Sequence, residues 1–282
     1  MKSNRKLSFI IVAIIYVLAV ALGVLVYRVL PVESVWLKLL IADVLATTFT
    51  FIFSVILSNA SVYDPYWSVQ PMVIAVCFAV GAKINLTHVL VLIAVLYWGI
   101  RLTANWAYTF KGLNHQDWRY TMLKEKTGAF YPLINFLGIH MFPTLVVYAC
   151  TLPVVEVLLG EYTLNVGSAL FFMLSILSAT LQLVSDIQMQ SFRNKNVGGF
   201  IRNGLWTYSR HPNYLGEILM WWGMGLYAVC LMPNKWYLII GAVVNTLMFL
   251  FVSIPMAEKR QSRKDGYAEY KKATRILLPI KK

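Results

Sequence analysis

Long apolar segments, separated by short polar ones, run along almost the whole chain. Several reach twenty residues or more, which is roughly the length a helix needs to cross a hydrocarbon core of about 30 Å. Most lack the polar stripe that a surface helix of a soluble protein carries. The pattern predicts an all-α, polytopic transmembrane helix bundle with spans at 8–30, 36–57, 69–82, 86–110, 130–157, 167–189, 213–232 and 236–255.

The third of these segments, 69–82, is the shortest. It has 14 residues and contains Pro71 near its start, so it is either a short tilted helix or a re-entrant piece. The predicted number of spans is therefore eight or seven. The composition agrees with a membrane protein, because 59% of residues are hydrophobic and 13% are charged, against about a quarter charged in soluble domains. No repeat or linker interrupts the pattern, so we expect a single membrane domain over 1–282.

Lysine and arginine are distributed unevenly between the predicted loops. With eight spans, twenty of them fall on the side of both termini, four on the opposite side, and Arg101 inside a span. The positive-inside rule then predicts that both termini are cytoplasmic. The same rule explains the net charge of +13, and basic residues without a recognisable recognition domain argue against nucleic acid as a partner. The expected environment is membrane lipid, in a bacterial inner membrane rather than the endoplasmic reticulum.

Two further features limit the possibilities. No small-residue cleavage site with a polar region behind it follows the first apolar run, so we expect a retained first helix rather than a removed signal peptide. Cys77, Cys150 and Cys230 lie in separate apolar spans, without metal-ligand or redox spacing. We therefore expect no bound metal.

A polar stripe marks the end of the sixth predicted span. Gln182, Asp186, Gln190 and Arg193 follow one another at steps of four, four and three, so they share one helical face. The arginine would bind a phosphate of a nucleotide, and the aspartate its ribose or base edge. The alternative is an interhelical polar clamp that holds the bundle together.

The segment 204–217, with the sequence GLWTYSRHPNYLGE, combines polar, aromatic and helix-starting residues. The preceding backbone segment is expected to end at Pro212, and Asn213 is expected to cap the next helix. Free backbone N–H groups at this helix start, beside Arg210 and His211, would form an anion site. Glu217, one turn further on, would accept hydrogen bonds from a ribose or an amide. Alternatively, the arginine only sets topology and the asparagine only caps.

Tyr97, Arg101 and Asn105 form another face, inside the fourth predicted span. An arginine this deep requires a partner, and Asp43 or Asp64 would supply it. This set either is a structural ion pair or forms a cavity wall that orients a polar group of a lipid substrate.

The C-terminal segment 256–282 is basic and amphipathic. It is expected to be cytoplasmic and either to lie on the lipid headgroups or to fold over the polar end of the bundle as a lid. Pro279 and the apolar residues before it favour the lid.

The block SRHPNY-x-GE, together with Asp186, Arg193 and a Tyr270 nine residues before Pro279, resembles the C-terminal domain of the steroid 5-alpha-reductase family, and more closely that of its bacterial membrane relatives. The similarity continues through the Tyr63–Trp67 segment, through 98–102 and through 116–120, and so covers most of the chain. The block is specific to this broad superfamily rather than to one reaction. The resemblance implies a helical membrane bundle that binds NADP(H) from the cytoplasmic side and reduces a carbon–carbon double bond conjugated to a carbonyl.

The resemblance also implies a cofactor-binding half at 167–282 and a substrate half at 1–130. The cofactor-binding residues it implies are Gln182, Asp186, Arg193, Asn196, Tyr208, Arg210, His211, Asn213, Tyr214, Glu217, Tyr270 and Arg275. The catalytic residues it implies are Asp64, Tyr97 and Arg101. Asp64 is only a loose counterpart of the family's glutamate, and Tyr97 stands about one position from its tyrosine, with Trp98 nearer. The resemblance therefore does not extend to a steroid as the substrate.

The reaction so implied is hydride transfer to the β-carbon of an enone or a similar alkene in a hydrophobic or lipid substrate. A donor on the carbonyl oxygen would stabilise the enolate, and a carboxyl kept protonated by burial, such as that of Asp64, could be this donor.

Two alternatives remain open. Isoprenylcysteine carboxyl methyltransferases share an RHP-x-Y-x-G segment and a basic tail, and use S-adenosylmethionine. A non-enzymatic lipid-binding protein would leave the polar stripe purely structural. The Asp186–Arg193 pair favours a phosphate-rich dinucleotide over the cationic adenosylmethionine.

Overall fold

The computed structural model of this chain describes residues 4–195 and 199–279, and within these ranges every regular element is a helix. The α-helices are α1 (Arg5–Val29), α2 (Val35–Ile56), α3 (Tyr66–Val80), α4 (Leu86–Thr109), α5 (Trp118–Thr127), α6 (Tyr131–Ile134), α7 (Phe142–Leu159), α8 (Val166–Lys195), α9 (Pro212–Leu231), α10 (Ile240–Met248), α11 (Ile254–Gln261) and α12 (Tyr267–Ala273). Short π-helical segments join α6 to α7 and α10 to α11, so each of these pairs continues in one direction.

Short polar residues at helix starts explain several boundaries. The side-chain oxygens of Asn4, Ser34 and Asn85 accept hydrogen bonds from backbone N–H groups in the first turns of α1, α2 and α4. Each satisfies a donor that the helix itself cannot satisfy. The apolar runs behind these caps then continue as helix until the next polar connection.

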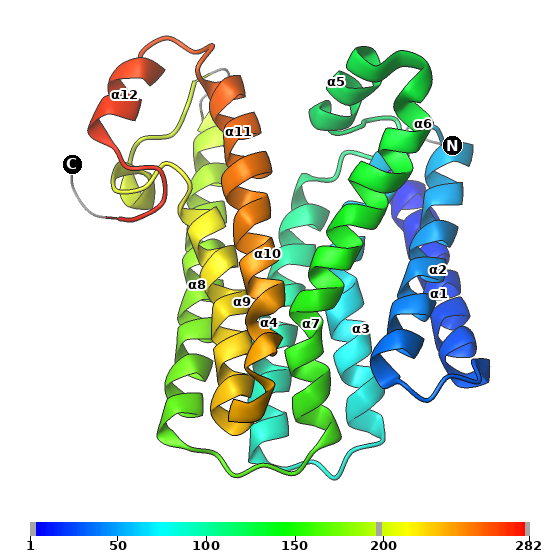
Figure 1. Ribbon diagram of the computed structural model, residues 1–282. Coiled ribbons are helices and arrows are strands. Elements are labelled where there is room, and N and C mark those ends of the chain that lie inside the picture. The colour runs from blue at the N-terminus through cyan, green and yellow to red at the C-terminus, as the bar shows by residue number, and fades with distance from the viewer. Residues whose placement is uncertain (1–3, 196–198, 280–282) are drawn as a thin grey trace.

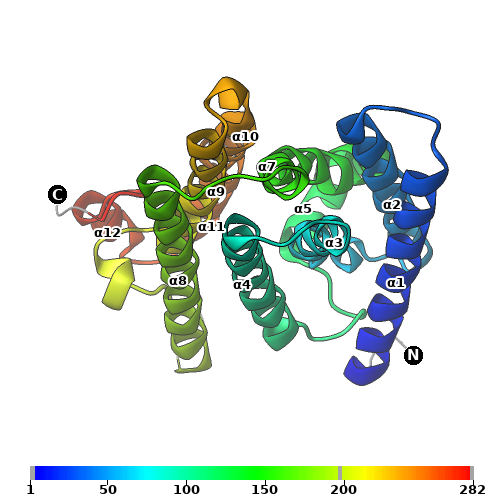
Figure 2. The same cartoon turned by 90° about the horizontal axis from the view of Figure 1, so that it is seen from below.

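Seven of the described helical stretches are long and apolar enough to cross a membrane, which confirms the polytopic helix bundle. They are α1, α2, α4, α8, α9, the continuous stretch Trp118–Leu159 and the continuous stretch Pro233–Gln261. The predicted segment 69–82 is a helix, α3, of 15 residues. It lies in the bundle beside α4 and α7 (Figures 1 and 2), and it is too short to belong to the seven.

The helices form one bundle with two distinct ends. In Figure 1 the connections α1–α2, α3–α4 and α7–α8 lie at the lower end, whereas both termini, α5 and α12 lie at the upper end. Seen from below, α1 and α2 stand on one side, α8, α9 and α10 on the other, and α3, α4 and α7 between them (Figure 2). Both termini lie at the same end of the bundle, as an even number of membrane crossings requires.

Glycine residues allow α8 and α9 to approach closely. A Cβ atom on Gly216 would lie 2.6 Å from the Ser178 carbonyl oxygen, and one on Gly223 would lie 2.1 Å from the Ser175 Oγ. Small residues at such crossings are typical of helix packing in lipid, where backbones gain dispersion contacts by close approach. This packing fixes the register in which the polar ends of α8 and α9 meet.

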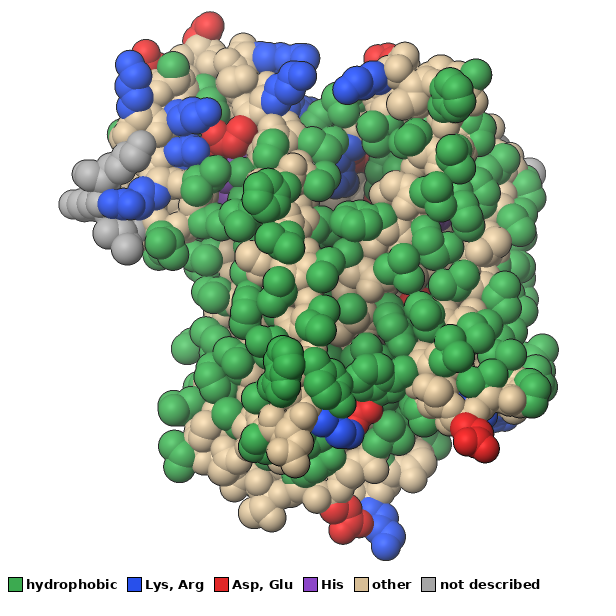
Figure 3. All heavy atoms as spheres, in the orientation of Figure 1, with side chains coloured by type: hydrophobic (Ala, Val, Ile, Leu, Met, Phe, Trp, Pro, Cys, Tyr) green, Lys and Arg blue, Asp and Glu red, His purple; other side chains and the backbone are tan. Residues whose placement is uncertain are grey.

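The surface of the bundle is apolar along its middle. Figure 3 shows hydrophobic side chains over the middle of this face and Lys and Arg side chains gathered at its upper end. Outward residues such as Val17, Ile56 and Phe251 are more than half exposed, which in water would be an aggregation hazard. The protein is therefore an integral multi-pass membrane protein.

Candidate functional site

An ion-pair network joins α4, α8 and α9 near the upper end of the bundle. Arg101 Nη1 lies 3.0 Å from Asp186 Oδ2, and Arg101 Nη2 lies 3.6 Å from Glu217 Oε2. The prediction that Asp43 or Asp64 pairs with Arg101 is therefore wrong. Both actual partners are far along the chain, and only helix packing brings them to the arginine. Asn105, one turn from Arg101, donates to the same Asp186 oxygen at 3.2 Å.

Glu217, the second acidic member of this network, lies between two tryptophan side chains. The indole N–H groups of Trp98 and Trp221 donate to its two carboxylate oxygens, each at 2.8 Å. Its residue exposure is 6%. These contacts leave Glu217 engaged with protein groups, so its predicted contact with a ribose or an amide stays a prediction.

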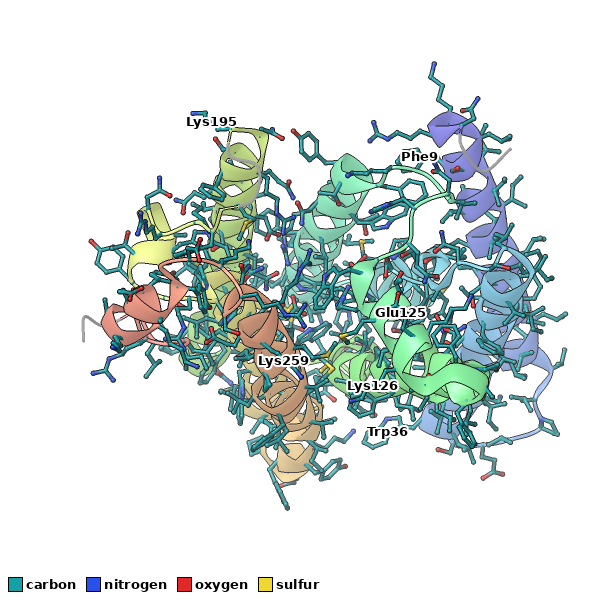
Figure 4. The ribbon with its side chains drawn as sticks, turned by 90° about the horizontal axis from the view of Figure 1, so that it is seen from above. Phe9, Trp36, Glu125, Lys126, Lys195 and Lys259 are labelled. Carbon is teal, nitrogen blue, oxygen red and sulfur yellow. The ribbon has the colours of Figure 1, made fainter. Side chains whose placement is uncertain are left out.

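A polar hollow of about 290 Å³ opens directly above the network, between α8, the start of α9, α11 and the loop before α5. Figure 4 looks down onto this end of the bundle, where nitrogen- and oxygen-bearing side chains crowd the space between these elements. Seven of the residues predicted to bind a cofactor line the polar hollow, namely Asp186, Arg193, Arg210, His211, Asn213, Tyr214 and Tyr270. The helical spacing in α8 and the turn at Pro212 thus bring two separate sequence motifs to one place.

Two arginines face the polar hollow without a carboxylate within salt-bridge distance among the described residues. Arg193 comes from the last turn of α8, and Arg260 comes from α11. Their positive charges are close enough to act on each other. Arg260 also lies over the ring of Trp118, 4.3 Å from its centroid. Like charges held together in this way favour an anion between them.

A wider hollow of about 1040 Å³ adjoins the polar hollow and shares Asp117, Arg193 and Arg260 with it. Asp64, predicted as catalytic, lines this wider hollow and accepts a hydrogen bond from Tyr120 Oη at 2.6 Å. Burial raises the pKa of the Asp64 carboxyl to about 6, although the Arg119 charge and the Tyr120 hydrogen bond oppose the shift. Asp64 is thus closer to protonation near neutral pH than an exposed carboxyl.

The C-terminal segment folds over the polar end as the lid arrangement requires. Glu258 accepts hydrogen bonds from Arg210 Nε at 2.9 Å, from His211 Nε2 at 2.9 Å and from Tyr267 Oη at 2.7 Å. The Arg210 guanidinium also donates to the Thr274 carbonyl oxygen, and Tyr270 Oη to that of Trp206. Arg210 is consequently engaged in holding the tail, and its free availability to an anion stays a prediction.

The start of α9 differs from the prediction in one respect. His211, not Asn213, occupies the capping position, and Pro212 is the first helical residue. The cap assigned to Asn213 is therefore wrong, because the helix begins at Pro212, two residues earlier than a cap at position 213 requires. Asn213 instead faces the polar hollow, beside Tyr214, whose ring stacks on that of His211 with centroids 5.2 Å apart.

The remaining predicted residues lie elsewhere. Gln182 is buried between α8 and α9, and Tyr97 bonds across to Thr180 on α8 at 3.1 Å. Tyr208 is 44% exposed and follows the short 3₁₀ turn Gly204–Thr207. The backbone carbonyl of Arg275 accepts a hydrogen bond from the Arg210 N–H at 3.0 Å, and Asn196 lies outside the described residues. The polar hollow is not lined by Gln182, Tyr97, Tyr208 or Arg275.

The three residues predicted as catalytic do not form one cluster. No hydrogen bond or ion pair between Asp64, Tyr97 and Arg101 is present in the part of the chain that the structure describes. No group of three or more His, Cys, Asp or Glu side chains in that part is placed to hold a metal ion.

Sequence reasoning missed several residues of the site. Arg260 was counted only as a tail charge, and Trp118, Phe200 and Gln261 had no assigned role, yet all line the polar hollow. The side-chain oxygen of Gln261 is buried there, and no described residue is its hydrogen-bond partner. The only signal in the sequence was their position just beyond the apolar segments, where polar residues are ordinary.

Comparison with known proteins places the chain in a family. Residues 50–274 match the model of the family described as "Protein of unknown function (DUF1295)", and the chain belongs to that family, which includes steroid 5-alpha-reductase-like proteins. The chain is also similar to the uncharacterized protein C594.04c of Schizosaccharomyces pombe, at 28% identity over 203 residues. That alignment covers 62% of this chain and 59% of the yeast protein, so the chain spans about three fifths of this relative. No solved structure matches the chain significantly.

Proposed function

We propose that this protein is a membrane reductase that binds NADPH in the polar hollow and reduces a polarised carbon–carbon double bond of a hydrophobic or lipid substrate. One observation carries the proposal. Arg193 and Arg260 face the same hollow without salt-bridge partners in the described chain, beside the hydrogen-bonding groups of Asp186, Asn213 and Tyr214. An anion with several acceptor oxygens compensates two such charges better than water does.

The residues present suit a dinucleotide phosphate. The arginines would hold phosphate oxygens, and the aromatic rings of Trp118, Phe200 and Tyr214 offer faces for stacking. The unpartnered Gln261 oxygen would accept a hydrogen bond from a ribose hydroxyl or an amide. The polar and wide hollows together exceed the range of about 300–1,000 Å³ that is usual for small-molecule sites, so space does not limit a dinucleotide.

The Arg101–Asp186–Glu217 network would hold the residues of this site in position. It fixes the ends of α4, α8 and α9 relative to one another, and thereby fixes the floor of the hollow on which the cofactor would rest. A bound NADPH would supply the hydride. Asp64, on the wall of the wider hollow, accepts a hydrogen bond from Tyr120, and this pair would deliver a proton or hold a carbonyl oxygen.

The test is cofactor titration with the full chain purified in nanodiscs. Arg193→Ala should weaken NADPH binding by about tenfold to a hundredfold, since a hydrogen bond to a charged group contributes roughly 1.5–3 kcal/mol. Lys195→Ala is the matched control. It removes a positive charge two residues away on the same helix, at a position that does not line the polar hollow, and it should change the affinity less than twofold.

Other outcomes would redirect the assignment. Selective binding of S-adenosylmethionine without NADPH binding would indicate the methyltransferase alternative, although the positive charges of Arg193 and Arg260 disfavour a cationic cofactor. Binding of neither would leave a lipid-binding protein. If NADPH binds, mass spectrometry of lipids from cells with and without the gene should show one species shifted by two mass units.

A further inference from the structure

A second cavity lies at the opposite side of the bundle, between α1, α2 and α3. This apolar groove has a volume of about 390 Å³ and is lined by aliphatic and aromatic side chains that include Val20, Val73 and Phe78. It shares no lining residue with the polar or the wide hollow. It extends along α1 from Tyr16 to Arg28, and twelve residues of helix correspond to about 18 Å.

Three buried polar side chains form the floor of the apolar groove. Asp43 on α2 accepts hydrogen bonds from Tyr66 Oη at 3.0 Å and from Gln70 Nε2 at 2.6 Å, both on α3. Each of the three residues is more than nine-tenths buried, and each lines the groove. Ionisable and amide groups at such a depth are costly in a membrane protein and usually mark a functional position.

The floor is incomplete as a purely structural contact. The Asp43 carboxyl joins α2 to α3 through its two donors, but the side-chain oxygen of Gln70 is buried and has no hydrogen-bond partner among residues 4–195 and 199–279. Water is scarce at this depth, and an unsatisfied acceptor there is unfavourable. A leucine or methionine at position 70 would pack against the apolar walls without this penalty, so the amide oxygen points to a partner that comes from outside the chain.

We propose that the apolar groove binds one lipid chain that carries a hydroxyl group, and that this hydroxyl donates its hydrogen bond to the Gln70 amide oxygen. The walls determine the apolar character of the occupant, and 390 Å³ lies within the usual range of small-molecule sites. The floor determines the functional group. The Tyr66 hydroxyl already donates to Asp43, and the Tyr16 hydroxyl already donates to the Val62 carbonyl at 2.8 Å. An acceptor therefore remains, and its ligand has to be a donor.

The mouth of the groove agrees with an amphiphile rather than a free hydrocarbon. Arg28 lies at its outer end, exposed at the last turn of α1, where its charge can remain in the interface. The long axis of the groove thus runs from a charged rim at the lower end of the bundle to the polar floor. This inference is independent of the proposed cofactor site.

The test uses two photoactivatable probes in nanodiscs of neutral phospholipid, namely a C16 alcohol with a diazirine in its chain and the methyl ether of the same molecule. Only the alcohol can donate a hydrogen bond. The full-length protein should be labelled on peptides of α1–α3, about fivefold more by the alcohol than by the ether, as one net hydrogen bond predicts. Gln70→Met should reduce this preference to below twofold while labelling by the ether persists.

A matched variant separates the ligand contact from helix packing. Tyr66→Phe removes the other donor to Asp43 but leaves the Gln70 oxygen in place, so it should keep the preference for the alcohol. Gly23→Phe should reduce labelling by both probes, because the new ring occupies the groove that Gly23 lines. The added Cβ atom fits without a clash, since it would lie 3.7 Å from the Ala42 carbonyl oxygen and 3.7 Å from the Ala46 Cβ atom. Equal labelling by alcohol and ether in the unmodified protein, or a preference that survives Gln70→Met, would overturn the proposal.

Discussion

Arg101 illustrates how a single residue in this protein depends on its surroundings. A lone arginine in a membrane span is costly, and here two carboxylates and the rings around Glu217 make the position tenable. Both terminal nitrogens of its guanidinium face carboxylates, whereas its Nε has no hydrogen-bond partner in the described part of the chain. The residue acts as a junction between three helices.

Asp64 provides a pH-dependent prediction at the same scale. Its pKa in the folded protein is about 6, above the ordinary 3.8, mainly because of burial. The folded state thus holds this proton more tightly than the unfolded chain, and the associated stabilisation is present below pH 4 and lost as the pH rises through 6. Asp64→Asn, which keeps an acceptor for Tyr120, should become more stable relative to the unmodified protein by up to roughly 3 kcal/mol between pH 4 and pH 7.

Thermal unfolding of both proteins in detergent across this pH range checks the prediction. Glu125→Gln, at an exposed position on α5, is the control and should show no such trend. A constant difference between the Asp64→Asn and unmodified melting temperatures would contradict the assigned burial.

Among the elements, α11 and α12 contact the polar end through the Glu258 carboxylate and through several hydrogen bonds to backbone carbonyls. The Glu258 carboxylate accepts hydrogen bonds from Arg210, His211 and Tyr267. The C-terminal segment then runs beside residues 204–211, where the backbones of Ser209 and Arg275 pair. The motif that looked like an anion site therefore also works as the anchor of the lid.

Removal of this charge should release α12. Glu258→Gln leaves the Arg210 guanidinium facing a neutral amide, and loss of one partner from a buried ion pair costs roughly 3–5 kcal/mol. Limited trypsin digestion should then cleave the 259–275 region several-fold faster than in the unmodified protein. Glu269→Gln on the exposed face of α12 is the matched control, and equal digestion of both variants would show that the carboxylate is not the anchor.

At the scale of the whole molecule, the two ends of the bundle differ in charge. The end with both termini carries most of the lysines and arginines (Figure 3), as well as the polar and wide hollows. The positive-inside rule assigns this end to the cytoplasm, where nucleotide cofactors are abundant. The orientation itself is an expectation from the sequence.

Cysteine labelling tests the orientation. In a background with Cys77, Cys150 and Cys230 replaced by serine, Lys126→Cys lies at the upper end and Glu161→Cys in the lower α7–α8 connection (Figures 1 and 4). A membrane-impermeant maleimide should label Glu161→Cys in intact cells and Lys126→Cys only in inverted vesicles. The reverse pattern would place the hollows on the outside.

The amino-acid sequence by itself determined the helices and their order, because the length of an apolar run and the polar residues that cap it are local properties. It also identified seven of the residues that line the polar hollow, since Asp186 and Arg193 share one helical face and the 204–217 segment places Asn213 and Tyr214 at a helix start. Only the tertiary structure decided which charges pair. Arg101 forms ion pairs with Asp186 and Glu217, and Arg210 forms one with Glu258. Arg193 and Arg260 form no salt bridge in the described chain. These choices depend on how helices far apart in the sequence cross, and no local pattern encodes that geometry.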